Sequence, residues 1–245
     1  MRTALRSVLR RGGLLPDEER LRIDLEPEFR ALHERCVPFT MTSPERMYAV
    51  WQAVRHVVRA RVPGDIVECG VWRGGSSMLA ALALLEAGDD ERALYLYDTF
   101  AGMSEPGERD VTVSGASALP EWRQAQRGEV NEWCFSPLEE VERNLRSTGI
   151  DPARLRFVEG KVEDTIPATA PERISVLRLD TDWYESTWHE LTHLYPRLSP
   201  GGVLIVDDYG HWQGAREAVD RYFGEVAEPI LLARTDYTGR IGVRS

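Results

Sequence analysis

Short apolar runs separated by helix-like stretches recur along most of the chain. Five of these runs have the length and composition of strands buried in a sheet. The stretches between them carry apolar residues every three or four positions, which is the spacing of an amphipathic helix. The expected strands are residues 65–69, 94–98, 155–158, 174–180 and 203–207.

The stretch Thr42-Ser43-Pro44-Glu45 predicts the start of the first helix of this series. It offers a capping residue, a proline at the first helical position and a glutamate that would complete a capping box. Apolar residues then follow at helical spacing as far as Val58. The other expected helices are residues 76–87, 137–147, 185–198 and 216–223.

Alternating strands and helices predict an α/β fold, in which a parallel sheet has helices on both faces. Residues 230–233 and 240–244 predict a closing hairpin around Asp236-Tyr237-Thr238-Gly239. The hairpin would complete a mostly parallel, seven-stranded sheet with an antiparallel edge. Residues 100–135 hold Gly, Pro, Ser and charges with little periodicity, so we expect a long loop or lid there.

Composition narrows the class of protein. The 245 residues are enough for one α/β domain, and the net charge of -10 argues against a nucleic-acid partner. Three cysteines without a CxxC motif make a disulfide framework or a thiolate zinc site improbable. No apolar run approaches the ~18 residues of a membrane span, and the N-terminus lacks the apolar region of a signal peptide. We therefore expect a cytoplasmic protein without a membrane partner.

The ends of the expected strands carry the main functional signal. In parallel sheets, ligands bind beyond the carboxyl ends of the strands. Four strands end at Cys69, Asp98, Asp180 and Asp207. Their terminal side chains should therefore face one shared cleft.

Asp180, Asp207 and Asp208 predict a metal site in that cleft. Three bare carboxylates raise one another's pKa, and a hard divalent cation such as Mg²⁺ removes this penalty. A bound cation also lowers the pKa of a hydroxyl group and turns it into a nucleophile. Asp180 and His211 are candidates for the base that takes the hydroxyl proton. The competing interpretation is that Asp207 and Asp208 simply stabilise a turn.

A glycine-containing loop after the first strand predicts a second ligand. Glu68-x-Gly70-x-x-x-Gly74-Gly75 lets the backbone turn tightly and approach a ligand, although it is neither GxGxxG nor a Walker motif. Asp98, at the end of the next strand, could accept hydrogen bonds from both hydroxyls of a ribose. The alternative is a solvated turn with a glycine needed for packing.

A rival motif is His189-Glu190-Leu191-Thr192-His193, which matches the HExxH pattern of zinc hydrolases. Glu217 offers a third ligand. The predicted helix lies between two parallel strands, so its apolar residues should face the sheet and its histidines should face outward, away from the cleft. We therefore interpret the histidines as part of a solvated helix surface and keep the zinc hydrolase as a remote alternative.

Four sequence blocks follow one another in order along the chain: DIVECGVWRGGS at 65–76, YDTFAGM at 97–103, LRLDTDWYEST at 177–187 and VDDYGHW at 206–212. With these blocks, the chain from about Phe39 to Phe223 resembles the macrocin and mycinamicin sugar O-methyltransferase family. This resemblance implies the class I methyltransferase (Rossmann-like) fold, S-adenosylmethionine as the methyl donor and a Mg²⁺-dependent site. Two features depart from the pattern, since many members have Gly at the position of Thr181 and residues 104–135 match only weakly.

The resemblance also assigns the cofactor residues. Asp98 would hold the ribose, and the stretch 160–165 would lie beside adenine with Glu163 or Asp164 available to its amino group. The pocket for the methionine part would be shaped by Glu68, Gly70, Gly74 and Ser76.

The family implies an acceptor hydroxyl on the sugar of a glycosylated natural product, such as a macrolide or another antibiotic. A catechol-like or polyketide hydroxyl is the alternative acceptor. We expect residues 1–40 to form an N-terminal arm or lid and residues 41–245 to form the methyltransferase domain. The arm could cover the active site of a neighbouring copy in a homodimer or a higher homo-oligomer.

Overall fold

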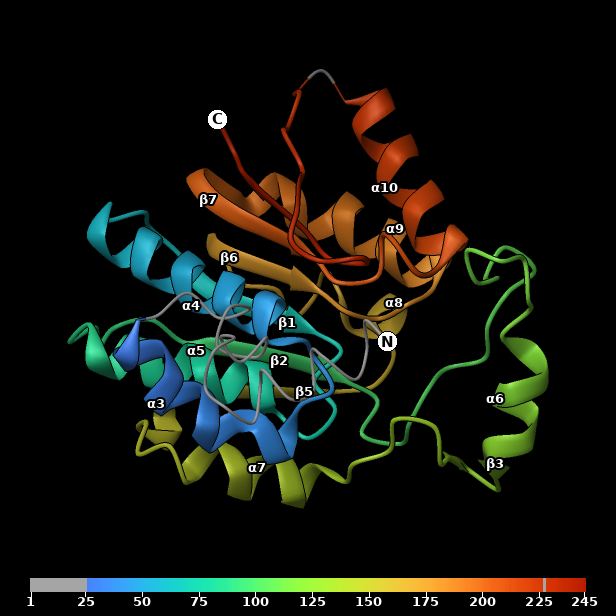
Figure 1. Ribbon diagram of the computed structural model, residues 1–245, viewed down its shortest axis with the longest axis horizontal. Coiled ribbons are helices and arrows are strands. Elements are labelled where there is room, and N and C mark those ends of the chain that lie inside the picture. Colours follow the sequence, from blue (N-terminus) through green and yellow to red (C-terminus); the bar gives the residue numbers. More distant parts are fainter. Residues whose placement is uncertain (1–25, 227) are drawn as a thin grey trace, which may run out of the picture.

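A seven-stranded sheet forms the centre of the protein (Figure 1). The computed structural model describes residues 26–226 and 228–245. The strand order is β5-β2-β1-β6-β7-β9-β8; the first five strands are parallel, and β9 runs antiparallel to both β7 and β8. The strands are β1 (Asp65–Cys69), β2 (Leu94–Asp98), β5 (Leu155–Glu159), β6 (Ile174–Leu179), β7 (Leu198–Val206), β8 (Ala233–Arg234) and β9 (Arg240–Val243).

Helices cover both faces of this sheet, and a separate apolar core lies between each face and its helices. The α/β fold and the C-terminal antiparallel hairpin are therefore confirmed. Short 3-10 helices are η1 (Val37–Phe39), η2 (Pro152–Arg154) and η3 (Tyr195–Arg197). One face packs α3 (Pro27–Cys36), α4 (Pro44–Arg59), α5 (Gly75–Glu86) and α7 (Leu138–Arg146), and the other packs α8 (Val162–Thr165), α9 (Tyr184–Leu194) and α10 (Gln213–Glu225).

The start of α4 differs from the prediction in one detail. The Ser43 side chain caps the helix by accepting the backbone N–H of Arg46 at 3.2 Å, and Pro44 occupies the first turn. Glu45 stands one position too early to reach back to the cap, so no capping box forms. The Ser43 hydroxyl instead donates to Asp236 in the C-terminal hairpin at 2.8 Å.

Residues 100–135 are more ordered than the expected loop. They contain α6 (Leu119–Ala125) and a small hairpin of β3 (Gln126–Arg127) and β4 (Val130–Asn131). This insertion lies to one side of the sheet (Figure 1). The Trp183 indole donates to the Ser104 carbonyl at 2.9 Å, and Asp110 accepts the backbone N–H of Tyr184 at 2.8 Å. These are long-range contacts, which periodicity along the chain does not reveal.

The expected N-terminal arm has two parts. Residues 1–25 lie outside the described residues. In the remainder, Phe29 and Cys36 of α3 are fully buried in the core shared with α4 and α5. Within the described ranges, no helix has the length and apolarity needed to cross a bilayer.

Candidate active site

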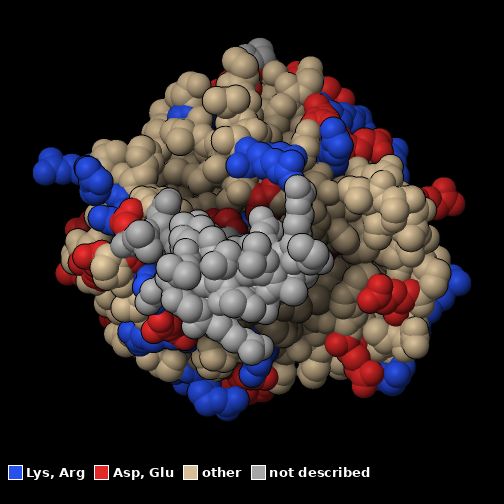
Figure 2. Space-filling view, viewed as in Figure 1, with Lys and Arg blue, Asp and Glu red and all other residues tan. Residues whose placement is uncertain are grey.

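A cavity of about 320 Å³ opens beyond the carboxyl ends of the central strands. A second cavity of about 70 Å³ adjoins it, and the two share Gly70, Asp98 and Asp180 in their walls. Acidic atoms are visible in the central hollow of the surface (Figure 2). The larger cavity is lined by residues that follow β1, β2, β6 and β7, as well as by residues 39–42 and part of the insertion.

The loop after β1 is shaped by Gly70. This residue has φ +82°, and a Cβ atom there would overlap the carbonyl oxygen of Asp180. Only glycine lets the two loops approach so closely. The backbone N–H of Gly70 donates to the Tyr97 carbonyl at 2.8 Å, which extends the sheet pairing to the cavity edge.

Asp98 lies at the end of β2 and lines both cavities. Its carboxylate accepts the backbone N–H groups of Val71 at 2.7 Å, Trp72 at 3.0 Å and Phe100 at 2.8 Å. Burial raises the pKa of this carboxyl, and the three backbone donors oppose that rise. Each carboxylate oxygen can accept more than one hydrogen bond, so Asp98 retains acceptor capacity toward a ligand hydroxyl.

Of the other predicted cofactor residues near β1, some lie on a cavity wall and others do not. Ser76 is buried and lines the larger cavity. Glu68 is not on the wall of either cavity, because its carboxylate is buried against Ser77 and Arg178. Gly74 is also away from the wall; its left-handed backbone, φ +90°, begins α5 and leaves room for Leu145 of α7.

The stretch 160–165 borders the smaller cavity. Gly160, Lys161, Val162 and Glu163 line it, whereas Asp164 is exposed and does not. Of the two acids considered for the adenine amino group, the structure thus places only Glu163 at a cavity wall.

The structure brings Asp180, Asp207 and Asp208 together. Each offers a carboxylate oxygen, and the three oxygens lie within 4.8 Å of one another. Neighbouring parallel strands cause this grouping, since the N–H of Asp207 donates to the Leu179 carbonyl at 2.9 Å. Asp207 and Asp208 are buried, while Asp180 is half-buried.

Two arginines that the sequence analysis missed lie among these acids. Arg178 contacts Asp180 and Asp207, both at 2.8 Å, and also pairs with Glu68. Arg46, at the start of α4, pairs with Asp207 and with Asp236 at 3.0 Å. A signal for Arg178 was present, because it is the one charged residue inside the apolar run 174–179.

A fourth acid, Asp182, also joins the cluster. It has φ +67°, accepts the Trp212 indole N–H at 2.6 Å and donates its own backbone N–H to Asp208 at 3.1 Å. Burial and the charge of Asp180 raise the pKa of Asp182, and burial and the neighbouring acids raise the pKa of Asp208 well above its usual range. The sequence signal was the spacing Asp180-x-Asp182, which the analysis did not weigh.

The cluster fits a hard divalent cation. Its ligands are carboxylate oxygens, which Mg²⁺ prefers. The raised pKa of Asp208 results partly from carboxylate repulsion, which a cation would relieve. Arg46 and Arg178 both form ion pairs with Asp207. Asp208 forms no ion pair with an arginine among the described residues.

His211 lies on the wall of the larger cavity. Its Nδ1 is 3.3 Å from the Tyr237 hydroxyl, and its ring packs edge-on against Trp212. The structure therefore places His211 near the acids, in a position that also serves packing.

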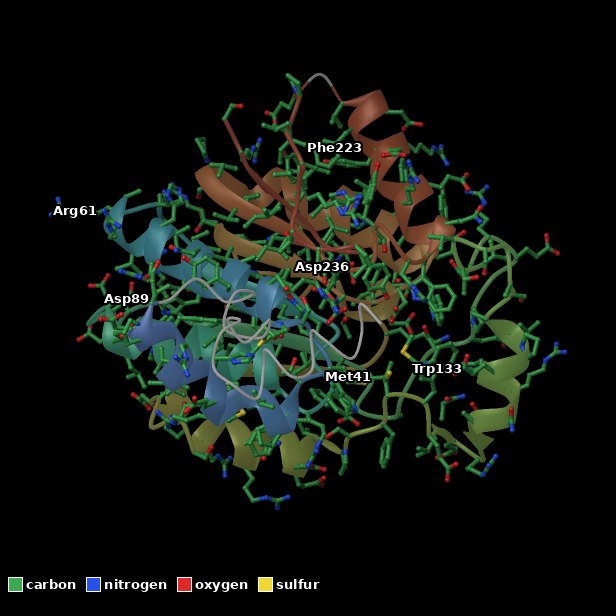
Figure 3. All side chains as sticks on the ribbon, in the orientation of Figure 1. Met41, Arg61, Asp89, Trp133, Phe223 and Asp236 are labelled. Carbon is green, nitrogen blue, oxygen red and sulfur yellow. The ribbon has the colours of Figure 1, made fainter. Side chains whose placement is uncertain are left out.

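Three tryptophans form an aromatic wall. The ring of Trp183 is 5.0 Å from that of Trp212 and 5.8 Å from that of Trp133. Trp133 and Trp212 line the cavity, and Trp183 is buried behind them. Figure 3 shows Trp133 and Met41 near the same central region, with Asp236 close by. Trp133 belongs to the insertion, so this segment contributes directly to the cavity.

The HExxH motif does not form a metal site. His189 and His193 are partly exposed and their rings lie 4.4 Å apart, but Glu190 is fully buried and interacts with Thr181 and Cys69. Glu217 instead pairs with Arg109 at 3.3 Å. Within the described part of the chain, the only group of three potential metal ligands is the aspartate cluster. The structure therefore argues against the zinc hydrolase.

Comparison with known proteins agrees with this geometry. The sequence profile of the macrocin-O-methyltransferase (TylF) family matches residues 22–240. An 8-demethyl-8-(2,3-dimethoxy-alpha-L-rhamnosyl)-tetracenomycin-C 4'-O-methyltransferase from Streptomyces olivaceus is 37% identical over 88% of this chain and 79% of its own length. A mycinamicin III 3''-O-methyltransferase from Micromonospora griseorubida is 36% identical over 76% of this chain and 70% of its own.

The comparison with solved structures also finds similarity to an O-methyltransferase. The O-methyltransferase NovP superposes with a TM-score of 0.72 at 35% identity, covering 84% of this chain and 82% of that one.

Proposed function

This chain belongs to the macrocin-O-methyltransferase (TylF) family, and from this premise we propose that it transfers a methyl group from S-adenosylmethionine to a sugar hydroxyl of a glycosylated natural product. The observation that carries the proposal is one cavity that joins a candidate ribose acceptor, Asp98, to the cluster of Asp180, Asp207 and Asp208. Donor and acceptor can therefore meet in one enclosure, and holding them there lowers the barrier.

The donor occupies the side of the cavity near β1 and β2. Asp98 accepts the ribose hydroxyls, and Ser76 and the Gly70 turn border the methionine part. The smaller cavity, with Glu163 on its wall, receives adenine. The side of the larger cavity that holds the acids after β6 and β7 would remain for the acceptor.

The acceptor hydroxyl lies beside the aspartate cluster. Asp180, Asp207 and Asp208 would hold Mg²⁺ or another divalent cation, which when bound lowers the pKa of the hydroxyl and orients it. Arg46 and Arg178 form ion pairs with Asp207 and hold its carboxylate in place. The aromatic wall of Trp133 and Trp212 packs against the sugar ring, because apolar ring faces suit aromatic side chains.

Asp182 is the best placed of the candidate proton acceptors. It lines the cavity and is oriented by the Trp212 indole, whereas Asp180 is paired with Arg178 and the His211 ring lies against Trp212. Asp180 and His211, the candidates from the sequence, remain alternatives. Comparing Asp182→Asn with His211→Gln in single-turnover methyl transfer distinguishes Asp182 from His211, since only the variant that lacks the base loses the chemical step; loss of that step in neither variant would favour Asp180.

Calorimetry tests the ligands of this proposal, and a methyl-transfer assay then tests the reaction. S-adenosylhomocysteine and then Mg²⁺ are titrated into the wild type, Asp207→Ala and a control, Asp90→Asn, which removes an exposed charge far from the cavity. We expect S-adenosylhomocysteine to bind all three proteins and Mg²⁺ to be lost only with Asp207→Ala. Equal Mg²⁺ affinity in all three proteins would refute the metal assignment.

The acceptor class is tested separately. Glycosylated macrolides and a rhamnosylated tetracenomycin are compared with their aglycones and with a simple catechol, using tritiated S-adenosylmethionine. Methylation of glycosides alone supports a sugar hydroxyl, and methylation of aglycones or the catechol supports the alternative acceptor. We also propose a homodimer or a higher homo-oligomer, which a monomer in sedimentation equilibrium would refute.

A further inference from the structure

Glu190 is a buried acid that the proposed reaction leaves unexplained. It is the central glutamate of the HExxH motif and has no exposed surface. It projects from α9, one residue after His189, which contacts the Ile166 carbonyl at 2.9 Å. A buried carboxyl group costs free energy unless its oxygens are well paired.

The pairing of Glu190 is incomplete. Its Oε1 accepts a hydrogen bond from the Thr181 hydroxyl at 3.0 Å. Its Oε2 has no nitrogen or oxygen hydrogen-bond partner among the described residues, where the Cys69 thiol of β1 is the further group that interacts with the carboxyl group. No described arginine, lysine or histidine forms an ion pair with Glu190. Burial raises the pKa of Glu190 well above its usual range, and the charge of Glu163 adds to the rise.

The one strong partner of Glu190 occupies a critical position. Thr181 lies between Asp180 and Asp182, and the backbone reverses there because Asp182 adopts φ +67°. The Thr181 carbonyl is also approached by the Ser186 hydroxyl at 3.4 Å. The threonine is thus held at its side chain by α9 on the wall of the smaller cavity, while its two neighbours line the larger one.

We propose that Glu190 is a positioning residue, which holds the Thr181 hydroxyl and so fixes the spacing of Asp180 and Asp182 in the active site. This inference rests on the function proposed above. Glu190 touches neither cofactor nor acceptor; it acts through Thr181. The Asp180 N–H, bound to the Cys69 carbonyl at 2.9 Å, anchors the other side of the same turn.

Two matched pairs of variants test the proposal. Thr181→Ser keeps the hydroxyl and Thr181→Val removes it at nearly the same volume. Glu190→Gln keeps an acceptor for Thr181, whereas Glu190→Met fills the space without one. The readouts are Mn²⁺ affinity by calorimetry in the absence of cofactor and acceptor, and kcat and KM for methyl transfer.

We expect Thr181→Val and Glu190→Met each to weaken Mn²⁺ binding and lower kcat by about tenfold, as supporting residues around metal ligands commonly do. The KM for S-adenosylmethionine should not change in Glu190→Met, because Glu190 lines neither cavity, and the serine and glutamine variants should stay within about twofold of wild type. The double variant Thr181→Val/Glu190→Met should be no worse than either single one, because both remove the same hydrogen bond.

The proposal is overturned if Thr181→Val binds Mn²⁺ and turns over like Thr181→Ser, or if Glu190→Gln is as impaired as Glu190→Met. The threonine pair carries the test if Glu190→Met does not fold. Methyl transfer that all variants perform equally would refute the positioning role and leave the proposed function intact. No methyl transfer by wild type, with Mn²⁺ affinities that still separate as expected, would refute the function and leave the positioning role.

Discussion

Replacing Arg178 by methionine should destabilise the fold far more than replacing an exposed arginine. Arg178 is only 4% exposed at its side chain and pairs with Glu68, which is 5% exposed. In Arg178→Met, Asp207 would keep Arg46 and Asp180 would keep its contact with water, but Glu68 would retain only the Ser77 hydroxyl. The main cost is therefore an uncompensated buried carboxylate.

Removing one partner of a buried pair typically costs about 3–5 kcal/mol. For a chain of this size, each kcal/mol corresponds to roughly 2–4 °C in melting temperature, so we expect a fall of roughly 6–20 °C. The assay is thermal and urea unfolding followed by circular dichroism, with a chelator present throughout. The control is Arg146→Met, whose ion pair with Glu142 lies on an exposed helix surface and should contribute below about 1 kcal/mol.

The pH dependence of the stability of Arg178→Met tests the same reasoning a second time. Burial already raises the pKa of Glu68, and Arg178 lowers it, so Arg178→Met should raise it further. A carboxyl whose folded-state pKa lies above its unfolded value stabilises the fold at low pH and loses that contribution as the pH rises through the folded pKa. The loss of melting temperature caused by Arg178→Met should therefore be larger at pH 8 than at pH 5.5. The double variant Arg178→Met/Glu68→Gln should recover part of this loss. A melting temperature equal to that of Arg146→Met, or a deficit that grows on acidification, would refute the reasoning.

Further predictions address the site itself. Asp180→Asn should abolish turnover yet leave the Kd for S-adenosylhomocysteine within a few fold, and calorimetry that shows lost cofactor binding would reverse the assignment of the two halves. Asp98→Ala should weaken S-adenosylhomocysteine binding by about tenfold or more, since hydrogen bonds to charged groups are strong; an unchanged Kd would remove the ribose role. His193→Ala should leave kcat unchanged, and an inactive variant would revive the zinc interpretation. Burial and the nearby acids raise the pKa of Cys134 to about 12, so it should react with a disulfide reagent at pH 8 only after denaturant is added; fast native labelling would contradict this.

The insertion at 100–135 illustrates what local pattern cannot predict. Its helix and hairpin are stabilised by distant partners, such as the Trp122 indole on the Met103 carbonyl at 2.8 Å and Asp110 at the start of α9. None of these contacts leaves a periodic signal in the sequence. The insertion therefore looked like a loop, although it supplies Trp133 to the cavity wall.

The HExxH motif illustrates the opposite case: the sequence matches a zinc-binding pattern, but the described residues form no zinc site there. His189 and His193 are four positions apart and share one side of α9, where both are partly exposed and neither lines a cavity. Amphipathic periodicity thus predicted that the histidines lie away from the cleft, but not that His189 contacts the Ile166 carbonyl or that Glu190 is buried.

The sequence by itself determined the strand and helix order, the parallel sheet with its terminal hairpin and the grouping of Asp180, Asp207 and Asp208. These follow from local hydrophobic pattern and from the rule that parallel strands end at one edge. Tertiary structure alone decided which charges compensate one another. The pairing of β1 with β6 aligns Glu68 with Arg178, and α4 packs so that Arg46 reaches Asp207. Strand register and helix packing join residues more than a hundred positions apart, and no short-range pattern encodes those distances.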